Sequence, residues 1–252
     1  LRRQRQMCIR DSNQRAAVSQ GNNSTLTSLR GGPMTCGQTN HKPSFTLLHV
    51  DASSQGRLGL LSTPHGEVET PVFMPVGTQG TVKSLTPRAL REVGTEIVLT
   101  NTYHLYLRPG HSIIQKLGGL HRFMQWDGPV LTDSGGFQIC SMNELVSVRE
   151  SGVTFRSHLD GTEHFFTPEL SMALQAALGA DLVMALDECI PYPASFDRTL
   201  SSLELTARWA ERCRKAHTNP RQALLGIVQG GVYAELRQRS AREIVSLGFD
   251  GY

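Results

Sequence analysis

From residue 71 onward, short apolar runs alternate with longer segments that have helical character. The runs are rich in Val, Leu and Ile, which is typical of strands covered on both faces, and they span residues 71–77, 96–100, 130–133, 181–187 and 223–228. The segments between them predict helices at residues 86–93, 109–117, 167–178, 197–217 and 233–247. This alternation predicts a parallel sheet, either doubly wound or closed into a (β/α) barrel.

Polar residues just after three of the runs favour the barrel. Asp133, Asp187 and Gln229 each follow an apolar strand. In a barrel the ends of successive strands converge on one mouth, whereas an open sheet spreads them along an edge. Residues 76–80 after the first strand match neither a Rossmann fingerprint nor a P-loop. We therefore predict a TIM-type (β/α)8 barrel, truncated after about five βα units, with residues 249–252 beginning another strand.

Two smaller features flank this pattern. Apolar runs at 45–48 and 57–61, with a turn at 64–66, predict a short N-terminal β meander. Asp160-Gly161 between residues 153–155 and 164–166 predicts a β-hairpin insertion. We expect residues 44–252 to form one partial catalytic barrel domain. Residues 1–43 contain a single acid and many Ser, Asn, Gln and Arg residues, which predicts a disordered tail or an organellar targeting segment.

Composition excludes several classes of protein. The net charge of +3 permits a nucleic-acid partner without demanding one. The five cysteines are scattered, with no CxxC pair, so we predict neither a disulfide framework nor a metal site among them. No apolar run approaches the roughly 20 residues of a membrane span. These features predict a protein of the cytoplasm, with an organellar location as the alternative that the Arg-rich N-terminus leaves open.

One stretch combines the features of a nucleobase site. Asp133 supplies a carboxylate and Ser134 follows it. Gly135 and Gly136 have no side chain, so a planar ligand or another backbone can approach closely, and Phe137 offers an aromatic face. The alternative is a tight strand-to-helix turn in which Asp133 caps the next helix.

Three other strand ends extend this site. A carboxylate at Asp187 could accept two parallel hydrogen bonds from the N–H groups of a guanine edge, unless it is a capping or ion-paired residue. Gln229 offers an amide that can donate to a carbonyl such as guanine O6, although a structural role is equally open. Asn101 also points toward the predicted mouth. His104 is expected to be a packed histidine more than a base.

Six longer motifs stand out along the chain: Phe73-Met74-Pro75-Val76-Gly77-Thr78, Asn101-Thr102-Tyr103-His104-Leu105, Leu107-Arg108-Pro109-Gly110, Thr132-Asp133-Ser134-Gly135-Gly136-Phe137-Gln138, Ser157-His158-Leu159-Asp160-Gly161 and Asp187-Glu188-Cys189. In this order they resemble the queuine tRNA-ribosyltransferase family, also called tRNA-guanine transglycosylase. The resemblance runs from about residue 45 to the last residue and is closest to the bacterial type. It implies an enzyme of queuosine biosynthesis that exchanges guanine at the tRNA wobble position for a deazaguanine base.

The resemblance also implies roles for individual residues. Asp133 would be the catalytic acid/base and would contact the base together with Ser134, Gly135 and Gly136. Asp187 and Gln229 would recognise the base, Phe137 would stack on it, and Asn101 would shape the pocket. The family's Asp nucleophile and its structural zinc site of three Cys and one His are expected after residue 252. This chain alone is therefore expected to be inactive, and the full-length protein to be a homodimer that binds tRNA and no membrane.

Two alternatives remain open at this stage. One is a non-catalytic member of the same family that binds tRNA or pairs with a catalytic subunit. The other is an unrelated (β/α) barrel glycoside hydrolase, which also uses two carboxylates.

Overall fold

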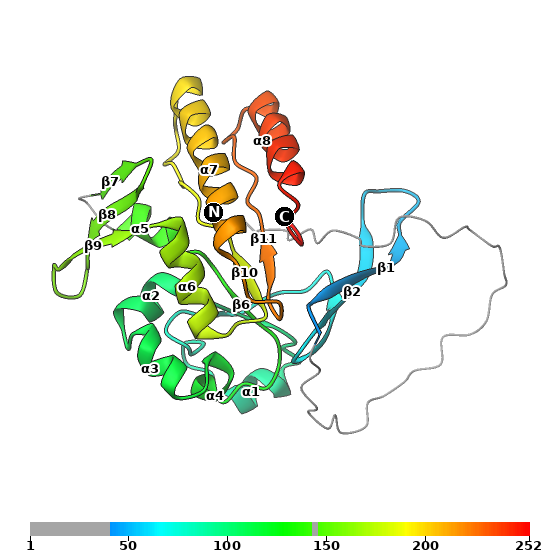
Figure 1. The fold of residues 1–252 in the computed structure, drawn as a ribbon. Helices are drawn as coiled ribbons and strands as arrows, with labels where there is room; N and C mark the ends of the chain where they lie inside the picture. The colour runs from blue at the N-terminus through cyan, green and yellow to red at the C-terminus, as the bar shows by residue number, and fades with distance from the viewer. Residues whose placement is uncertain (1–40, 143–145) are drawn as a thin grey trace.

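The computed structural model describes residues 41–142 and 146–252, and its centre is a five-stranded sheet (Figure 1). The strands lie in the order β11-β10-β6-β5-β4 and every neighbouring pair is parallel. Their bounds are β4 (Val76–Gly77), β5 (Val98–Thr100), β6 (Val130–Thr132), β10 (Leu182–Met184) and β11 (Ala223–Leu225). The predicted parallel sheet is confirmed, and residues 1–40 of the predicted tail lie outside the described part of the chain.

The sheet is open within the described residues, so it does not by itself show the predicted truncated (β/α)8 barrel. Beyond β11 the chain returns to the sheet, because Gly251 forms a parallel bridge with Leu225. Gly226 N donates to Gly251 O at 2.9 Å, and Asp250 N donates to Leu224 O at 2.9 Å. Residues 249–252 thus add to the edge of the sheet as the sequence predicts. The fold is mixed α/β with a parallel sheet, an arrangement compatible with part of a barrel.

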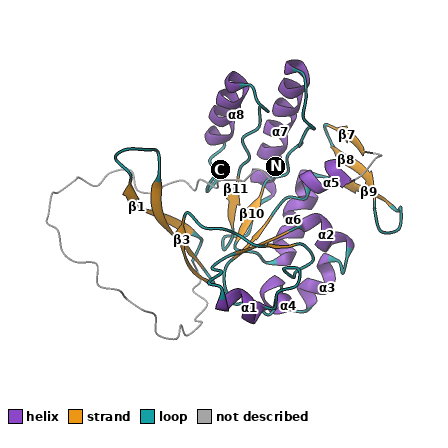
Figure 2. Cartoon of the chain, turned by 180° about the vertical axis from the view of Figure 1, so that it is seen from behind, coloured by secondary structure: helices purple, strands orange, loops and turns teal. Residues whose placement is uncertain are grey.

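The helices pack against one face of the sheet, where Val130 and Val183 belong to a core cluster that includes residues of the helices. Leu131 and Leu182 point to the other face and cluster with Leu61 of the N-terminal segment. In the views of Figure 1 and Figure 2, α1, α3 and α4 lie at the bottom, and α7 and α8 stand side by side at the top. The helices are α1 (Pro87–Glu92), α2 (Thr102–Leu107), α3 (His111–Lys116), α4 (Leu120–Met124), α5 (Gly136–Met142), α6 (Pro168–Leu178), α7 (Phe196–Ala216) and α8 (Ala234–Ser246). Within the described residues, none of them is both long and apolar enough to cross a membrane.

Capping residues fix where several helices begin. Thr86 accepts a hydrogen bond from Ala89 N, and Thr167 accepts one from Leu170 N, each just before a proline at the first helical turn. Two expectations need correction. The strand predicted at 71–77 shrinks to Val76–Gly77, because Pro71 and Pro75 have no N–H to donate to a sheet. The sequence pattern also missed α2 and α4, which are too short to show a helical period.

Two small antiparallel sheets flank the parallel one. The N-terminal meander is confirmed as β1 (Ser44–Val50), β2 (Arg57–Thr63) and β3 (Gly66–Thr70), in that order. The insertion contains β7 (Val146–Arg149), β8 (Gly152–Arg156) and β9 (Glu163–Phe166). The predicted hairpin is the β8–β9 pair, and β7 is a third strand that the hairpin prediction did not include. The two sheets lie at opposite edges of the molecule (Figure 2).

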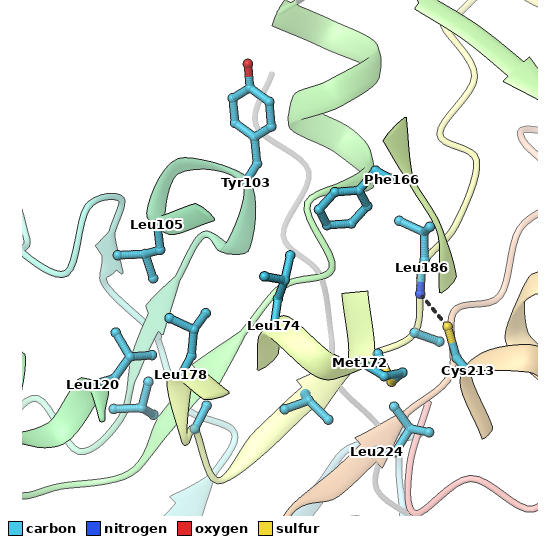
Figure 3. Packing of buried hydrophobic residues seen from close by; sticks show 14 of the residues in the cluster. Tyr103, Leu105, Leu120, Phe166, Met172, Leu174, Leu178, Leu186, Cys213 and Leu224 are labelled. Atoms are coloured by element: carbon cyan, nitrogen blue, oxygen red, sulfur yellow. Dashed lines mark hydrogen bonds between the residues drawn. The ribbon is translucent and has the colours of Figure 1, made fainter. Parts of the chain in front are cut away.

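The apolar core joins α6 and α7 to the end of β10. Met172, Leu174 and Leu178 of α6 are buried against the sheet (Figure 3). Cys213 of α7 accepts a hydrogen bond from Leu186 N at 3.3 Å, drawn as the dashed line in Figure 3. Burial raises the pKa of the Cys213 thiol to about 12, so it stays protonated. The core therefore fixes the segment that leads directly into Asp187.

A buried carboxylate connects three segments at the end of the sheet opposite to Asp187. Asp181, just before β10, hydrogen bonds to His65 Nδ1 at 2.6 Å and His121 Nε2 at 3.2 Å, and it accepts from Val130 N at 2.9 Å. These partners come from the β2–β3 turn, α4 and β6. Burial alone would raise the pKa of Asp181, but the hydrogen bonds from His121 and His65 outweigh it and hold the pKa below the ordinary 3.8.

We expect Asp181→Ala to lower the free energy of unfolding by about 3 kcal/mol, because three hydrogen-bond partners, two of them partly buried histidines, lose their acceptor. Since the pKa of Asp181 is lower in the fold, its contribution is complete above 3.8 and is lost as the pH falls toward the folded value. Urea unfolding between pH 7 and pH 3 should therefore show a shallower acid limb in the variant. Asp127→Asn, which alters an exposed pair with Arg91, is the control. Parallel pH profiles for the Asp181 variant and the unaltered chain would contradict this account.

Candidate active site

The carboxyl ends of the central strands bring the predicted polar residues to one place. Asn101 follows β5 and Asp133 follows β6, while Asp187 lies three residues beyond β10. All three are buried, Asp187 to 2% exposure and Asp133 to 9%. Buried polar groups are stable only when hydrogen bonded, so their partners define the site.

Asp133 is held by four donors. Its Oδ1 accepts from Thr102 N at 2.9 Å and from Gly135 N at 3.2 Å. Its Oδ2 accepts from Asn101 Nδ2 at 2.5 Å and from Gln138 Nε2 at 2.9 Å. The Gly135 bond lies before α5 and spans only two residues, so it closes a turn and does not cap that helix. The four donors together fix the carboxylate in one orientation.

The two glycines have a packing role that the sequence did not reveal. Gly135 has φ +85°, and a Cβ there would lie 3.2 Å from Tyr103 N. A Cβ on Gly136 would lie 2.5 Å from Asp187 O. Because these glycines lack a side chain, the start of α2 and the loop after β10 can pack closely against them. Their predicted contact with a base stays a prediction.

Asp187 joins the other predicted residues. Its Oδ2 accepts from Gln229 Nε2 at 2.6 Å, and its Oδ1 accepts from Ser134 Oγ at 3.4 Å. Gln229 is positioned in turn by its own N–H, which donates to Ser240 Oγ of α8 at 2.9 Å. The adjacent Glu188 forms an ion pair with Arg198. Ser134 thus links the loop of Asp133 to the Asp187–Gln229 pair.

Two aromatic residues lie at the edge of this network. Phe137 stands at the first turn of α5 with 51% of its surface exposed, so its predicted stacking on a base stays a prediction. Burial lowers the pKa of His104, and the nearby His158 lowers it further, against the opposing effect of Asp133. His104 is therefore uncharged at neutral pH, as expected of a packed histidine.

Comparison with known proteins shows the family of this chain. Residues 51–252 match the family model described as Queuine tRNA-ribosyltransferase. The chain belongs to the queuine tRNA-ribosyltransferase family. A Pelotomaculum thermopropionicum protein of that name is 62% identical over 209 residues, covering 83% of this chain and 56% of the relative. Proteins of the same name from Thermoanaerobacter sp. and Desulforamulus reducens are 58% and 59% identical, covering 82% and 79% of this chain and 56% and 54% of the relatives. The chain thus spans about half the length of the curated relatives that it matches.

Gln138 is a site residue that the sequence analysis of this queuine tRNA-ribosyltransferase family member did not select. Its amide nitrogen donates to Asp133, while its Oε1 is buried and has no hydrogen-bond partner among the described residues. A buried acceptor without a donor costs free energy unless a ligand supplies one. The signal was its position, because Gln138 lies in the first turn of α5 and its side chain reaches back to Asp133.

The described residues do not fit the zinc site expected of the family. Among the described residues, no cysteine belongs to a group of three side chains that could hold a metal ion together. His65, His121 and Asp181 place donor atoms within 4.8 Å of one another. Their imidazole rings, however, are stacked 3.5 Å apart at 14°. Because an imidazole lone pair lies in the ring plane, one ion cannot lie in both planes, and we interpret this cluster as a structural clamp.

Proposed function

We propose that this chain supplies the base-binding part of a tRNA-guanine transglycosylase, which exchanges guanine at the tRNA wobble position for a deazaguanine base in queuosine biosynthesis. The observation that supports it best is the Asp187–Gln229 pair, joined through Ser134 to the loop of Asp133. A guanine edge presents N–H donors beside a carbonyl acceptor. A carboxylate next to an amide matches that pattern, because the carboxylate accepts and the amide donates.

Asp133 is proposed as the acid/base. Base exchange at an anomeric carbon requires a proton for the departing guanine and removal of a proton from the incoming base. A carboxylate fixed by four hydrogen bonds can perform both transfers without reorienting. The free Oε1 of Gln138 adds an acceptor beside it for an N–H of the base. Asn101 shapes this part of the pocket, and Phe137 covers a face of the base.

The rest of the enzyme follows from the family. We propose that the five parallel strands belong to a (β/α)8 barrel, and that the Asp nucleophile, the remaining strands and the zinc ligands lie in the part of the relatives that this chain does not span. We also propose tRNA as the macromolecular partner, a homodimer as the assembly and the cytoplasm as the compartment.

The non-catalytic alternative remains the second candidate, because a retained base pocket does not by itself prove turnover. The glycoside hydrolase alternative conflicts with the family membership. The test is to join the full chain to the part of the Pelotomaculum relative that follows its match, and to measure incorporation of labelled guanine into tRNA. We expect exchange by this fusion protein and none by the chain alone. A fusion that binds tRNA but exchanges no guanine would favour the non-catalytic member.

A further inference from the structure

We propose that Arg198 is a positioning residue for base recognition: it neutralises and holds Glu188, and through Glu188 it places Asp187 against the base. Arg198 lies in the first turn of α7, outside the network of Asp133, Asp187 and Gln229. The proposal rests on the proposed function, because it assigns to Arg198 an effect on the affinity for a guanine-like base.

Glu188 is fastened to α7 through its backbone and its side chain. Its N–H donates to Thr206 Oγ1 at 3.1 Å, and its carbonyl accepts from Ser202 Oγ at 3.1 Å. The carboxylate receives both terminal nitrogens of Arg198, with Nη1 at 3.2 Å from Oε2 and Nη2 bonded to Oε1. This two-pronged geometry is the strong form of an arginine–carboxylate pair. Glu188 can therefore move only if α7 moves or if its ion pair with Arg198 breaks.

The charges explain why an arginine is needed here. Asp187 and Glu188 are consecutive and both are buried, so two carboxylates are removed from water side by side. The side chain of Glu188 is only 5% exposed, while that of Arg198 is 47% exposed. A buried carboxylate that loses its partner is strongly unfavourable, whereas a half-exposed guanidinium keeps much of its hydration. Losing Arg198 therefore penalises Glu188 and drives its carboxylate toward water.

A movement of Glu188 would displace Asp187 because the loop that contains both residues is held on two sides. A Cβ on Gly136 would lie 2.5 Å from Asp187 O, so the start of α5 packs closely against the loop on one side. On its other side Glu188 is held by α7. A shift of Glu188 consequently changes the distance from Asp187 to Gln229 and Ser134, which are the groups proposed to face the base.

The same helix offers a matched control. Arg208 lies about three turns further along α7 and pairs with Glu150, at side-chain exposures of 52% and 61%. Arg198 and Arg208 also line the same cleft of about 500 Å³ between β7 and α7. Both arginines therefore lie on the same helix, line the same cleft and pair with a glutamate. They differ in whether that glutamate side chain is buried. Exposed pairs contribute little, so Arg208→Ala should leave base recognition unchanged.

The experiment uses the full chain within the fusion protein. We expect Arg198→Ala to raise the KM for guanine between about 10-fold and 100-fold, the size of effect that a small misplacement produces. The kcat at saturating guanine and the KM for tRNA should stay within about 3-fold of the unaltered fusion. Arg198→Lys should recover part of the loss, since it restores the charge without the fork.

A charge-specific variant separates positioning from general destabilisation. The double variant Arg198→Ala with Glu188→Gln should regain most of the affinity for guanine, because a neutral amide needs no cation. Equilibrium binding of guanine, measured calorimetrically on the same proteins, keeps the test independent of turnover. An unaltered fusion that binds guanine without exchange would overturn the proposed activity alone. Guanine affinities that are equal in Arg198→Ala and Arg208→Ala, or no recovery in the double variant, would overturn the role of Arg198.

Discussion

Asp133→Asn in the fusion protein is expected to lower the rate of base exchange by about 10³-fold to 10⁴-fold, the range of a lost general acid–base group. An amide cannot take up or release the proton. Its NH2 group would also face at least one of the N–H donors that now surround the carboxylate, from Thr102, Gly135, Asn101 and Gln138. The measurement is single-turnover transfer of labelled guanine into tRNA at saturating base.

The control for this variant is Asp127→Asn, which makes the same chemical change in an exposed pair with Arg91. It should exchange guanine at the unaltered rate. Binding of tRNA should be unchanged in both variants, because Asp133 is proposed to act on the base and its proton. A single-turnover rate for Asp133→Asn within about 10-fold of the unaltered fusion would remove Asp133 from the acid/base role.

Much of the fold could be predicted because local patterns and tertiary packing agree. The strands at β5, β6, β10 and β11 are short, apolar and largely buried, so continuous apolar runs in the sequence were enough to locate them. Thr86-Pro87 and Thr167-Pro168 marked two helix starts correctly. Helices α2 and α4 were missed because five or six residues show no clear period.

The sequence predicted which residues follow the strands at the candidate site, but it did not predict their contacts. Polar residues after strands indicated Asn101, Asp133, Asp187 and Gln229, because parallel strands end at one edge. What each residue does there depends on contacts between distant segments. No spacing could show that Gly136 packs closely against Asp187 O, or that Glu188 forms an ion pair with Arg198, since both depend on how α5 and α7 pack on the sheet.

Asp187→Asn is expected to lower kcat/KM for guanine by about 10⁴-fold, because a site built to accept base N–H groups would present an N–H of its own. Gln229 Nε2 already donates to this carboxylate at 2.6 Å, so an amide nitrogen on that side would also oppose Gln229. Most of the loss should appear as weaker guanine binding, measured by calorimetry, while the affinity for tRNA stays unchanged. This pattern differs from that of Asp133→Asn, which should bind guanine and fail in the chemical step.

Glu188→Gln is the matched control for Asp187→Asn, because it makes the same change one residue further along a buried loop. Its carboxylate faces Arg198, and the half-exposed guanidinium can return to water when its partner becomes neutral. We therefore expect Glu188→Gln to bind guanine within about 10-fold of the unaltered fusion. If Asp187→Asn exchanged labelled guanine as efficiently as Glu188→Gln, the base would have to be recognised elsewhere. If both variants lost guanine binding equally, the loop would matter for its total charge, and the hydrogen-bonding edge of Asp187 would not be the recognition element.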